Sequence, residues 1–91
     1  MNSNEINWNN IIKKDVRGLN NEDFGEVKDI QGNYVIVERG TINKEKFYFP
    51  KEQVENYDGN ILKIRLVEFE LINYQDEPFR KNRKDSLLKV M

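Results

Sequence analysis

Glycines divide the first half of the chain at nearly regular intervals. Four of the five glycines lie at positions 18, 25, 32 and 40, seven or eight residues apart. This is the spacing of short β-strands joined by tight turns. Alanine, the best helix former, is absent, whereas nine Ile and seven Val supply β-branched side chains that favour strands. The chain is therefore predicted to be all-β, a small barrel or sandwich.

Apolar side chains between these glycines alternate with period two, as expected for strands with one face on a core. The pattern is clearest in "NYVIVERG", "EKFYFP" and "NILKIRL". The residues predicted to point inward are Val35, Val37, Phe47, Phe49, Leu62, Ile64 and Leu66. Two hairpin turns are predicted, at Gln31-Gly32-Asn33 and at Asp58-Gly59, because Gly and Asn accept the positive φ that tight hairpins need.

Short helical turns are predicted at two places. Pro50 ends the aromatic strand because proline cannot donate to a β-ladder, and the four residues after it are expected to form one turn. Near the amino terminus, Trp8, Ile11 and Ile12 have the spacing of one helical face. This segment is too short for an independent helix, and we expect Trp8 to plug one end of the barrel.

Ninety-one residues correspond to one small domain. We expect residues 1–14 to pack on a β-barrel formed by residues 15–71. Residues 72–91 lose the apolar period and are predicted to be a basic, partly ordered tail. Leu87, Leu88 and Val90 are its apolar residues that could hold part of the tail on the domain. Charge is uneven, because residues 80–91 carry +4 and residues 1–79 carry −5.

Missing residue types narrow the possible chemistry. The chain has neither Cys nor His, which removes the commonest zinc ligands and every Ser-His or Cys-His nucleophile. Acidic pairs such as Glu68 and Glu70 are more simply explained as a solvated face than as a catalytic dyad. No apolar run is long enough to span a bilayer, and the amino terminus does not resemble a secretory signal. We expect a cytoplasmic protein that is not an enzyme and has no cofactor or metal.

The tripeptide Asp23-Phe24-Gly25 occurs in protein kinases, where its aspartate binds magnesium. A kinase also needs a glycine-rich loop, a strand lysine paired to a helix glutamate and a catalytic-loop aspartate, none of which is present. We therefore interpret Gly25 as a permissive backbone position, Phe24 as a core residue and Asn20 to Asp23 as a turn.

A basic cluster near the carboxyl end is a candidate nucleic-acid contact. Arg80, Lys81, Arg83 and Lys84 could bind phosphates, and Phe79 could stack on a base. The alternative is a tail that only increases solubility, because most runs of charge are simply solvated.

A candidate protein-binding patch follows from the strand pattern. If the neighbouring valines and phenylalanines point inward, then Tyr34, Ile36 and Tyr48 point outward from adjacent strands. Exposed apolar patches of this kind mark partner or dimer surfaces. The alternative is that the amino-terminal segment, with Ile6 and Trp8, covers them.

The order of these features over residues 12 to 67 resembles the PRC-barrel family, small β-barrels known from a photosynthetic reaction-centre subunit and a ribosome-maturation factor. The resemblance is carried by Val16-Arg17-Gly18, Phe24-Gly25-Glu26-Val27, the aromatic strand ending at Pro50, and Val54 leading to Asp58-Gly59. It is strongest to stand-alone, mostly uncharacterised archaeal and bacterial members. Two departures are "NNED" in place of the family's Asp-Gly turn, and residues 72–91, which match nothing in the family.

The resemblance implies an antiparallel β-barrel of five to six strands that serves as a docking or assembly module without shared catalytic residues. We therefore expect a non-enzymatic protein that binds another protein or itself. The alternative is a ribosome- or RNA-associated factor that uses the basic tail.

Overall fold

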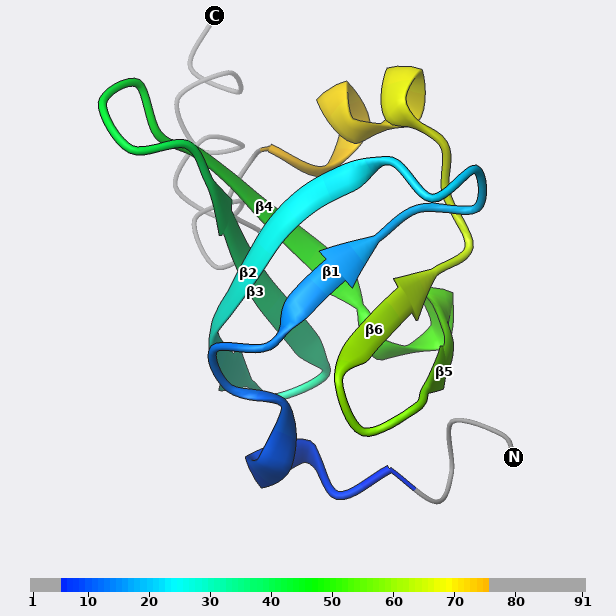
Figure 1. Cartoon of the computed structure of the whole chain (residues 1–91). Helices are drawn as coiled ribbons and strands as arrows, with labels where there is room; N and C mark the ends of the chain where they lie inside the picture. The colour runs from blue at the N-terminus through cyan, green and yellow to red at the C-terminus, as the bar shows by residue number, and fades with distance from the viewer. Residues whose placement is uncertain (1–5, 76–91) are drawn as a thin grey trace, which may run out of the picture.

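A single mixed β-sheet of six strands forms the body of the molecule in the computed structural model, which describes residues 6–75 (Figure 1). In sequence order the strands are β1 (Asp15–Arg17), β2 (Asp23–Gln31), β3 (Tyr34–Arg39), β4 (Glu45–Pro50), β5 (Val54–Tyr57) and β6 (Ile61–Ile64). Their spatial order is β4-β3-β2-β1-β6-β5. Three 3-10 helices accompany them: η2 (Trp8–Ile11), η3 (Lys51–Gln53) and η4 (Glu68–Tyr74). The predicted β-rich class is confirmed, and the six strands agree with the upper limit of the predicted five to six.

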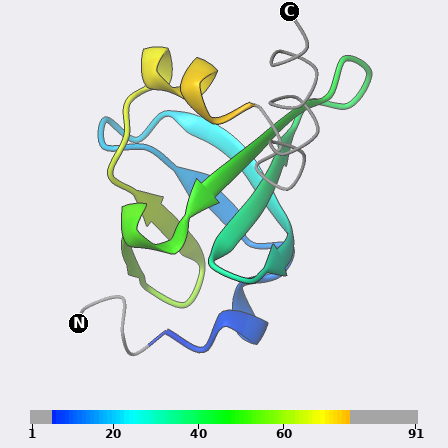
Figure 2. The ribbon, with the colours of Figure 1, turned by 180° about the vertical axis from the view of Figure 1, so that it is seen from behind.

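The sheet differs from a closed antiparallel barrel in two ways. Strand β1 pairs with β6 in parallel, with Asp15 opposite Ile61, although the other neighbouring strands are antiparallel. Strands β4 and β5 stand at the two ends of the strand order, so their pairing does not close the sheet. They are nevertheless consecutive in the chain, and η3 joins one edge of the sheet to the other. Figure 2 shows the sheet curled so that these edges face the same side.

Both predicted hairpin turns are confirmed. Gln31 pairs with Tyr34 across the turn between β2 and β3, where Gly32 has a φ of +57°. In the turn between β5 and β6, a carboxylate oxygen of Asp58 accepts hydrogen bonds from the backbone N–H groups of Asn60 and Ile61, both at 2.8 Å. These two bonds favour the ionised carboxylate and lower the pKa of Asp58.

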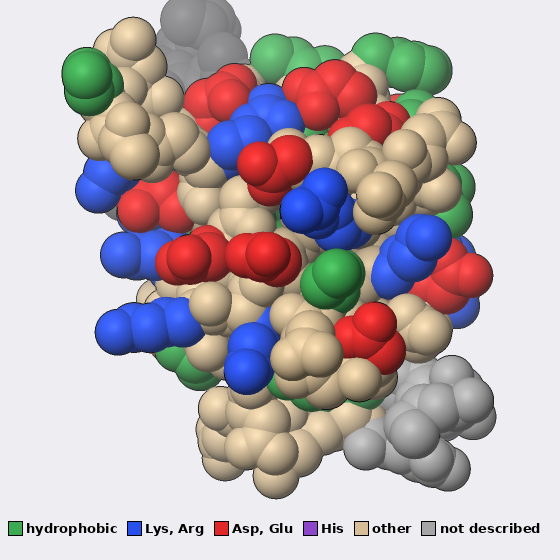
Figure 3. All heavy atoms as spheres, viewed as in Figure 1, with side chains coloured by type: hydrophobic (Ala, Val, Ile, Leu, Met, Phe, Trp, Pro, Cys, Tyr) green, Lys and Arg blue, Asp and Glu red, His purple; other side chains and the backbone are tan. Residues whose placement is uncertain are grey.

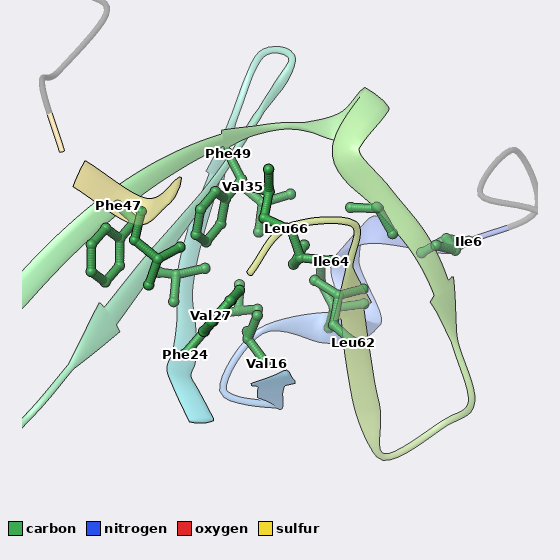
Figure 4. Packing of buried hydrophobic residues seen from close by; sticks show 14 residues of the cluster. Ile6, Val16, Phe24, Val27, Val35, Phe47, Phe49, Leu62, Ile64 and Leu66 are labelled. Atoms are coloured by element: carbon green, nitrogen blue, oxygen red, sulfur yellow. The ribbon is translucent and has the colours of Figure 1, made fainter. Parts of the chain in front are cut away.

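The core lies inside the curled sheet and is formed by side chains from all six strands (Figure 4). Its members are Ile6, Ile11, Val16, Phe24, Val27, Val35, Val37, Phe47, Phe49, Val54, Leu62, Ile64, Leu66 and Leu71. Every inward residue predicted from the alternation belongs to this cluster. The phenylalanine rings pack on one another, with the ring centroids of Phe47 and Phe49 5.8 Å apart.

The amino-terminal segment packs on the core, but not in the way expected for Trp8. Ile11 in η2 is fully buried, whereas Trp8 is only partly buried and packs at the border of the cluster. The ammonium group of Lys51 lies over the Trp8 ring, 4.8 Å from its centroid, which is a cation–π contact between η2 and η3. Ile11, rather than Trp8, therefore fills the core from this end.

The chain leaves the sheet earlier than the alternation of "NILKIRL" predicts. Strand β6 ends at Ile64, and the segment that contains Glu68 and Glu70 forms η4. A carboxylate oxygen of Glu70 accepts a hydrogen bond from the backbone N–H of Val67 at 2.9 Å, which satisfies a donor at the start of the helix. Leu71 is buried, and the Tyr74 ring lies 5.6 Å from that of Phe49 in β4. η4 thereby covers one end of the core.

Candidate protein-binding surface

Three segments that are distant in sequence lie along the same end of the molecule, with η4 between the other two (Figure 1). They are the loop of residues 18–22, the hairpin of residues 40–44 between β3 and β4, and η4. The backbone N–H of Leu19 donates to the carbonyl oxygen of Leu66 at 2.9 Å, which links the first loop to the approach of η4. Two charged side chains, Arg39 and Glu22, make hydrogen bonds that link η4 to the first loop and to the strands next to the hairpin.

Arg39, the last residue of β3, links β2, β4 and η4. Its guanidinium donates two parallel hydrogen bonds of 2.9 Å to the carboxylate of Glu68, and one each to Glu45 and to the backbone oxygen of Asp23. It also lies 5.4 Å from the centroid of the Phe47 ring. The hydrogen bonds to Glu68 are the main cause that raises the pKa of Arg39, and the same bonds lower the pKa of Glu68. Because the bidentate geometry is directional, it fixes the orientation of η4.

Glu22 makes the second link, between the first loop and η4. One carboxylate oxygen accepts from the backbone N–H of Asn20, and the other accepts from that of Glu68, both at 2.9 Å. Desolvation raises the pKa of Glu22, but the backbone hydrogen bonds from Glu68 and Asn20 outweigh it, and the pKa lies below the ordinary 4.5. The three segments therefore form one connected surface.

Large apolar side chains project into solvent from this connected surface. The exposed fractions are 90% for Ile42, 81% for Phe69, 68% for Ile72 and 44% for Leu19. We call these four residues the apolar end. In Figure 3, hydrophobic side chains stand at separate places along the upper edge of the view, one group over the β3–β4 hairpin and the others over η4. All the large hydrophobic residues that are strongly exposed within residues 6–75 belong to this group.

A separate groove of about 500 Å³ lies on the outer face of β1, β2 and β3. Asp15 pairs with Glu26 across β1 and β2, and Glu26 pairs with Glu38 across β2 and β3, so three carboxylates form a row. Glu38 has two lysine neighbours, Lys28 at 3.6 Å and Lys44 at 3.8 Å. Asp15 and Glu26 are exposed, whereas acid–base catalysis by a carboxyl group usually depends on shielding from water. The groove is thus a solvated, mixed-charge surface.

The residues of the Asp23-Phe24-Gly25 tripeptide have structural roles. Phe24 is fully buried in the core, and Gly25 has a φ of +108°. The Asp23 carboxylate accepts a hydrogen bond from the backbone N–H of Gly25 at 3.0 Å. Within residues 6–75 there is no group of three or more acidic side chains placed to hold a metal ion. The interpretation of Phe24 as a core residue and of Gly25 as a permissive backbone position is confirmed, whereas Asp23 is the first residue of β2 and not part of the preceding turn.

The predicted patch of Tyr34, Ile36 and Tyr48 is less exposed than expected. Ile36 and Tyr48 face each other across β3 and β4, on the side away from the core cluster, but only 5% and 9% of their surfaces are exposed. Tyr34 is partly buried. The expectation of an exposed patch is therefore wrong for Ile36 and Tyr48. Ile6 belongs to the core cluster and Trp8 packs against it, whereas Ile36 and Tyr48 are not members of that cluster.

The candidate nucleic-acid residues lie outside the described part of the chain. Phe79, Arg80, Lys81, Arg83 and Lys84 all fall within residues 76–91, as do Leu87, Leu88 and Val90. Their role as a phosphate-binding cluster stays a prediction.

The sequence interpretation missed the apolar end. In "VEFELINY" the alternation of Val67, Phe69 and Leu71 was compatible with a strand that buries all three. In the 3-10 conformation, whose side chains recur every three residues, Leu71 turns to the core and Phe69 to solvent. A usable signal was Glu70, three residues after Val67, because an acidic residue at that position can bind a free backbone N–H at a helix start.

Among residues 6–75, no helix has the length and apolar character needed to cross a bilayer. Comparison with protein-family models and with curated proteins finds no match for this chain.

Proposed function

We propose that this protein is a non-enzymatic protein-binding module whose partner docks on the apolar end. The observation that carries the proposal is the exposure of Phe69 and Ile72 on η4, at 81% and 68%. Apolar side chains this exposed are costly to keep in water when they gather on one surface, and such surfaces mark interaction sites. Aromatic residues are also enriched in the energetically dominant parts of interfaces.

The hydrogen-bonded attachment of η4 supports the same proposal. Arg39 and Glu22 attach η4 to the sheet by hydrogen bonds of 2.9 Å, so Phe69 and Ile72 project from an ordered support. Binding to an ordered surface loses less conformational entropy than binding to a mobile loop. The partner expected from this chemistry is a protein with a complementary apolar surface.

We also propose that the chain is a divergent PRC-barrel-like protein. In support, the Phe24-Gly25-Glu26-Val27 segment begins a long strand, the aromatic strand ends at Pro50, and Asp58-Gly59 lies in a hairpin turn. The resemblance places these features in the same order. It also implies a docking role rather than a shared catalytic one.

The test is affinity capture from an extract of the native organism, with the wild-type chain and the Phe69→Ser/Ile72→Ser variant as baits. Both substituted side chains are exposed, so the variant should fold. A matched control is Glu55→Ser/Asn56→Ser, which changes two exposed residues of β5. A specific partner should be retained by the wild type and the control and lost by the first variant. Equal retention by all three baits would contradict the proposal.

The alternative proposal, an RNA-associated factor, rests on the sequence of residues 79–84. Four cations next to Phe79 suit phosphate contacts and base stacking. RNA affinity should then fall when residues 80–91 are removed, and the affinity lost should decrease with added salt. An unchanged affinity after truncation would eliminate this alternative.

A further inference from the structure

The segments that carry the apolar end hold more negative than positive charge. Together with the neighbouring strand residues Arg39 and Glu45, they contain four carboxylates and two cations, a formal charge of −2. The carboxylates are Glu22, Glu45, Glu68 and Glu70, and the cations are Arg39 and Lys44. In Figure 3, acidic side chains gather just below the hydrophobic ones at the upper edge of the view. A partner on this surface therefore meets carboxylates beside apolar side chains.

Contacts within residues 6–75 leave much of this negative charge uncompensated. Glu22 and Glu70 accept hydrogen bonds from backbone N–H groups, which carry no net charge. Glu45 and Glu68 share a single cation, Arg39. Hydrogen bonds also lower the pKa of Glu22 and that of Glu68, so both carboxylates are ionised at neutral pH.

The second cation, Lys44, is engaged beside the separate groove. Its ammonium group lies 3.8 Å from a carboxylate oxygen of Glu38, and both residues line the groove on β1, β2 and β3. A surface with an excess of one sign of charge attracts partners of the opposite sign and repels partners of the same sign. Positive charge on the partner is therefore the property that this surface favours.

We propose that the partner docks on the apolar end through an apolar protein segment flanked by lysine or arginine. Phe69 and Ile72 lie three residues apart in η4, so they project from the same side of this 3-10 helix and contact the apolar part of the segment. The carboxylates of Glu45 and Glu70 attract the flanking cations. The inference rests on the proposed function, and it adds the chemical character of the partner.

The experiment compares two synthetic helical peptides as probes. Both carry leucine on one face, and the opposite face carries lysine in the first peptide and glutamate in the second. In NMR titrations of the ¹⁵N-labelled full chain, the lysine peptide should shift the amide signals of Leu19, Ile42, Phe69 and Ile72. It should bind about tenfold more tightly than the glutamate peptide at low salt, and added salt should reduce this ratio. Equal affinities, no binding of the lysine peptide, or shifts centred on β5 and β6 would overturn the inference.

A pair of variants tests the role of the carboxylates. In Glu45→Gln/Glu70→Gln the side-chain amide oxygens can still accept the existing hydrogen bonds, so the fold should be kept. The affinity for the lysine peptide should fall about threefold to tenfold. The control Glu26→Gln/Glu55→Gln removes the same charge from two exposed residues elsewhere on the sheet, and it should change the affinity much less. An equal loss in both variants would mean that only net charge matters, which contradicts the inference.

The variant Phe69→Ser/Ile72→Ser separates this inference from the proposed function. If it loses the partner captured from the extract while both peptides bind the wild type equally, the docking surface stands and the basic character of the partner is wrong. If it binds the lysine peptide as tightly as the wild type does, charge alone makes the contact and the inference is overturned. Shifts of the same signals when the protein alone is concentrated would assign the surface to a second copy and overturn the inference as well.

Discussion

At the scale of single residues, Gly25 is restricted both by its backbone angle and by its surroundings. Its φ of +108° is a conformation that side chains rarely adopt, and a Cβ atom there would lie 2.2 Å from the carbonyl oxygen of Glu38. Gly32 also has a positive φ, +57°, but no atom lies within 4 Å of the place where its Cβ would be. A side chain at Gly25 would therefore meet both a steric clash and an unfavourable backbone angle, whereas one at Gly32 would meet only the unfavourable angle.

Replacing Gly25 by alanine should strongly destabilise the fold. We expect Gly25→Ala to lower the free energy of unfolding by about 3 kcal/mol or more, because backbone strain and the clash with Glu38 add. Gly32→Ala should cost only about 1 kcal/mol, the ordinary penalty of a left-handed conformation. Urea denaturation of both variants measures the difference, and equal losses would show that the close approach to Glu38 is unimportant.

At the scale of elements, the attachment of η4 depends on carboxylates being ionised. The pKa of Glu68 is lowered chiefly by its hydrogen bonds from Arg39, and that of Glu22 by backbone N–H groups despite opposing desolvation. A carboxyl whose pKa is lower in the folded state stabilises the fold at pH values above its unfolded pKa. This contribution is lost as the pH falls from the ordinary value of 4.5 through the folded pKa.

The variant Glu68→Gln should therefore have a lower free energy of unfolding near neutral pH. Its free energy of unfolding should also decrease less than that of the wild type as the pH is lowered. Because the Glu68 side chain is 53% exposed, solvent screens the pair and the expected loss is at most about 1 kcal/mol. Unfolding by urea over a series of pH values above and below 4.5 measures it. A variant with an unchanged pH dependence would show that Arg39 and Glu68 do not determine the acid sensitivity.

Elements with a strict local pattern could be predicted from the sequence, and those defined by distant contacts could not. Strands β3 and β4 follow from alternation, and the turns at Gly32 and Asp58 follow from residues that accept their backbone angles. In contrast, the backbone N–H of Glu68, at the start of η4, donates a hydrogen bond to the carboxylate of Glu22, which is 46 residues away in the sequence. No local period indicates such a contact.

At the scale of the whole molecule, the sequence predicted the β-rich class but not how the strands are joined. The parallel pairing of β1 with β6 connects segments more than 40 residues apart, and it leaves β4 and β5 at the ends of the strand order. The predicted patch of Tyr34, Ile36 and Tyr48 likewise depended on contacts between distant parts of the chain. Alternation correctly placed Ile36 and Tyr48 opposite the core, but exposure depends on everything else that packs on that face.

The central claim is that a partner protein docks on the apolar end, and the most direct measurement is residue-resolved NMR of the ¹⁵N-labelled chain in native cell extract. Binding to a large partner should broaden the amide signals of Leu19, Ile42, Phe69 and Ile72 before those of β5 and β6. The same spectrum of Phe69→Ser/Ile72→Ser should remain sharp. Broadening centred on β5 and β6, or sharp signals throughout for the wild-type chain, would contradict the claim.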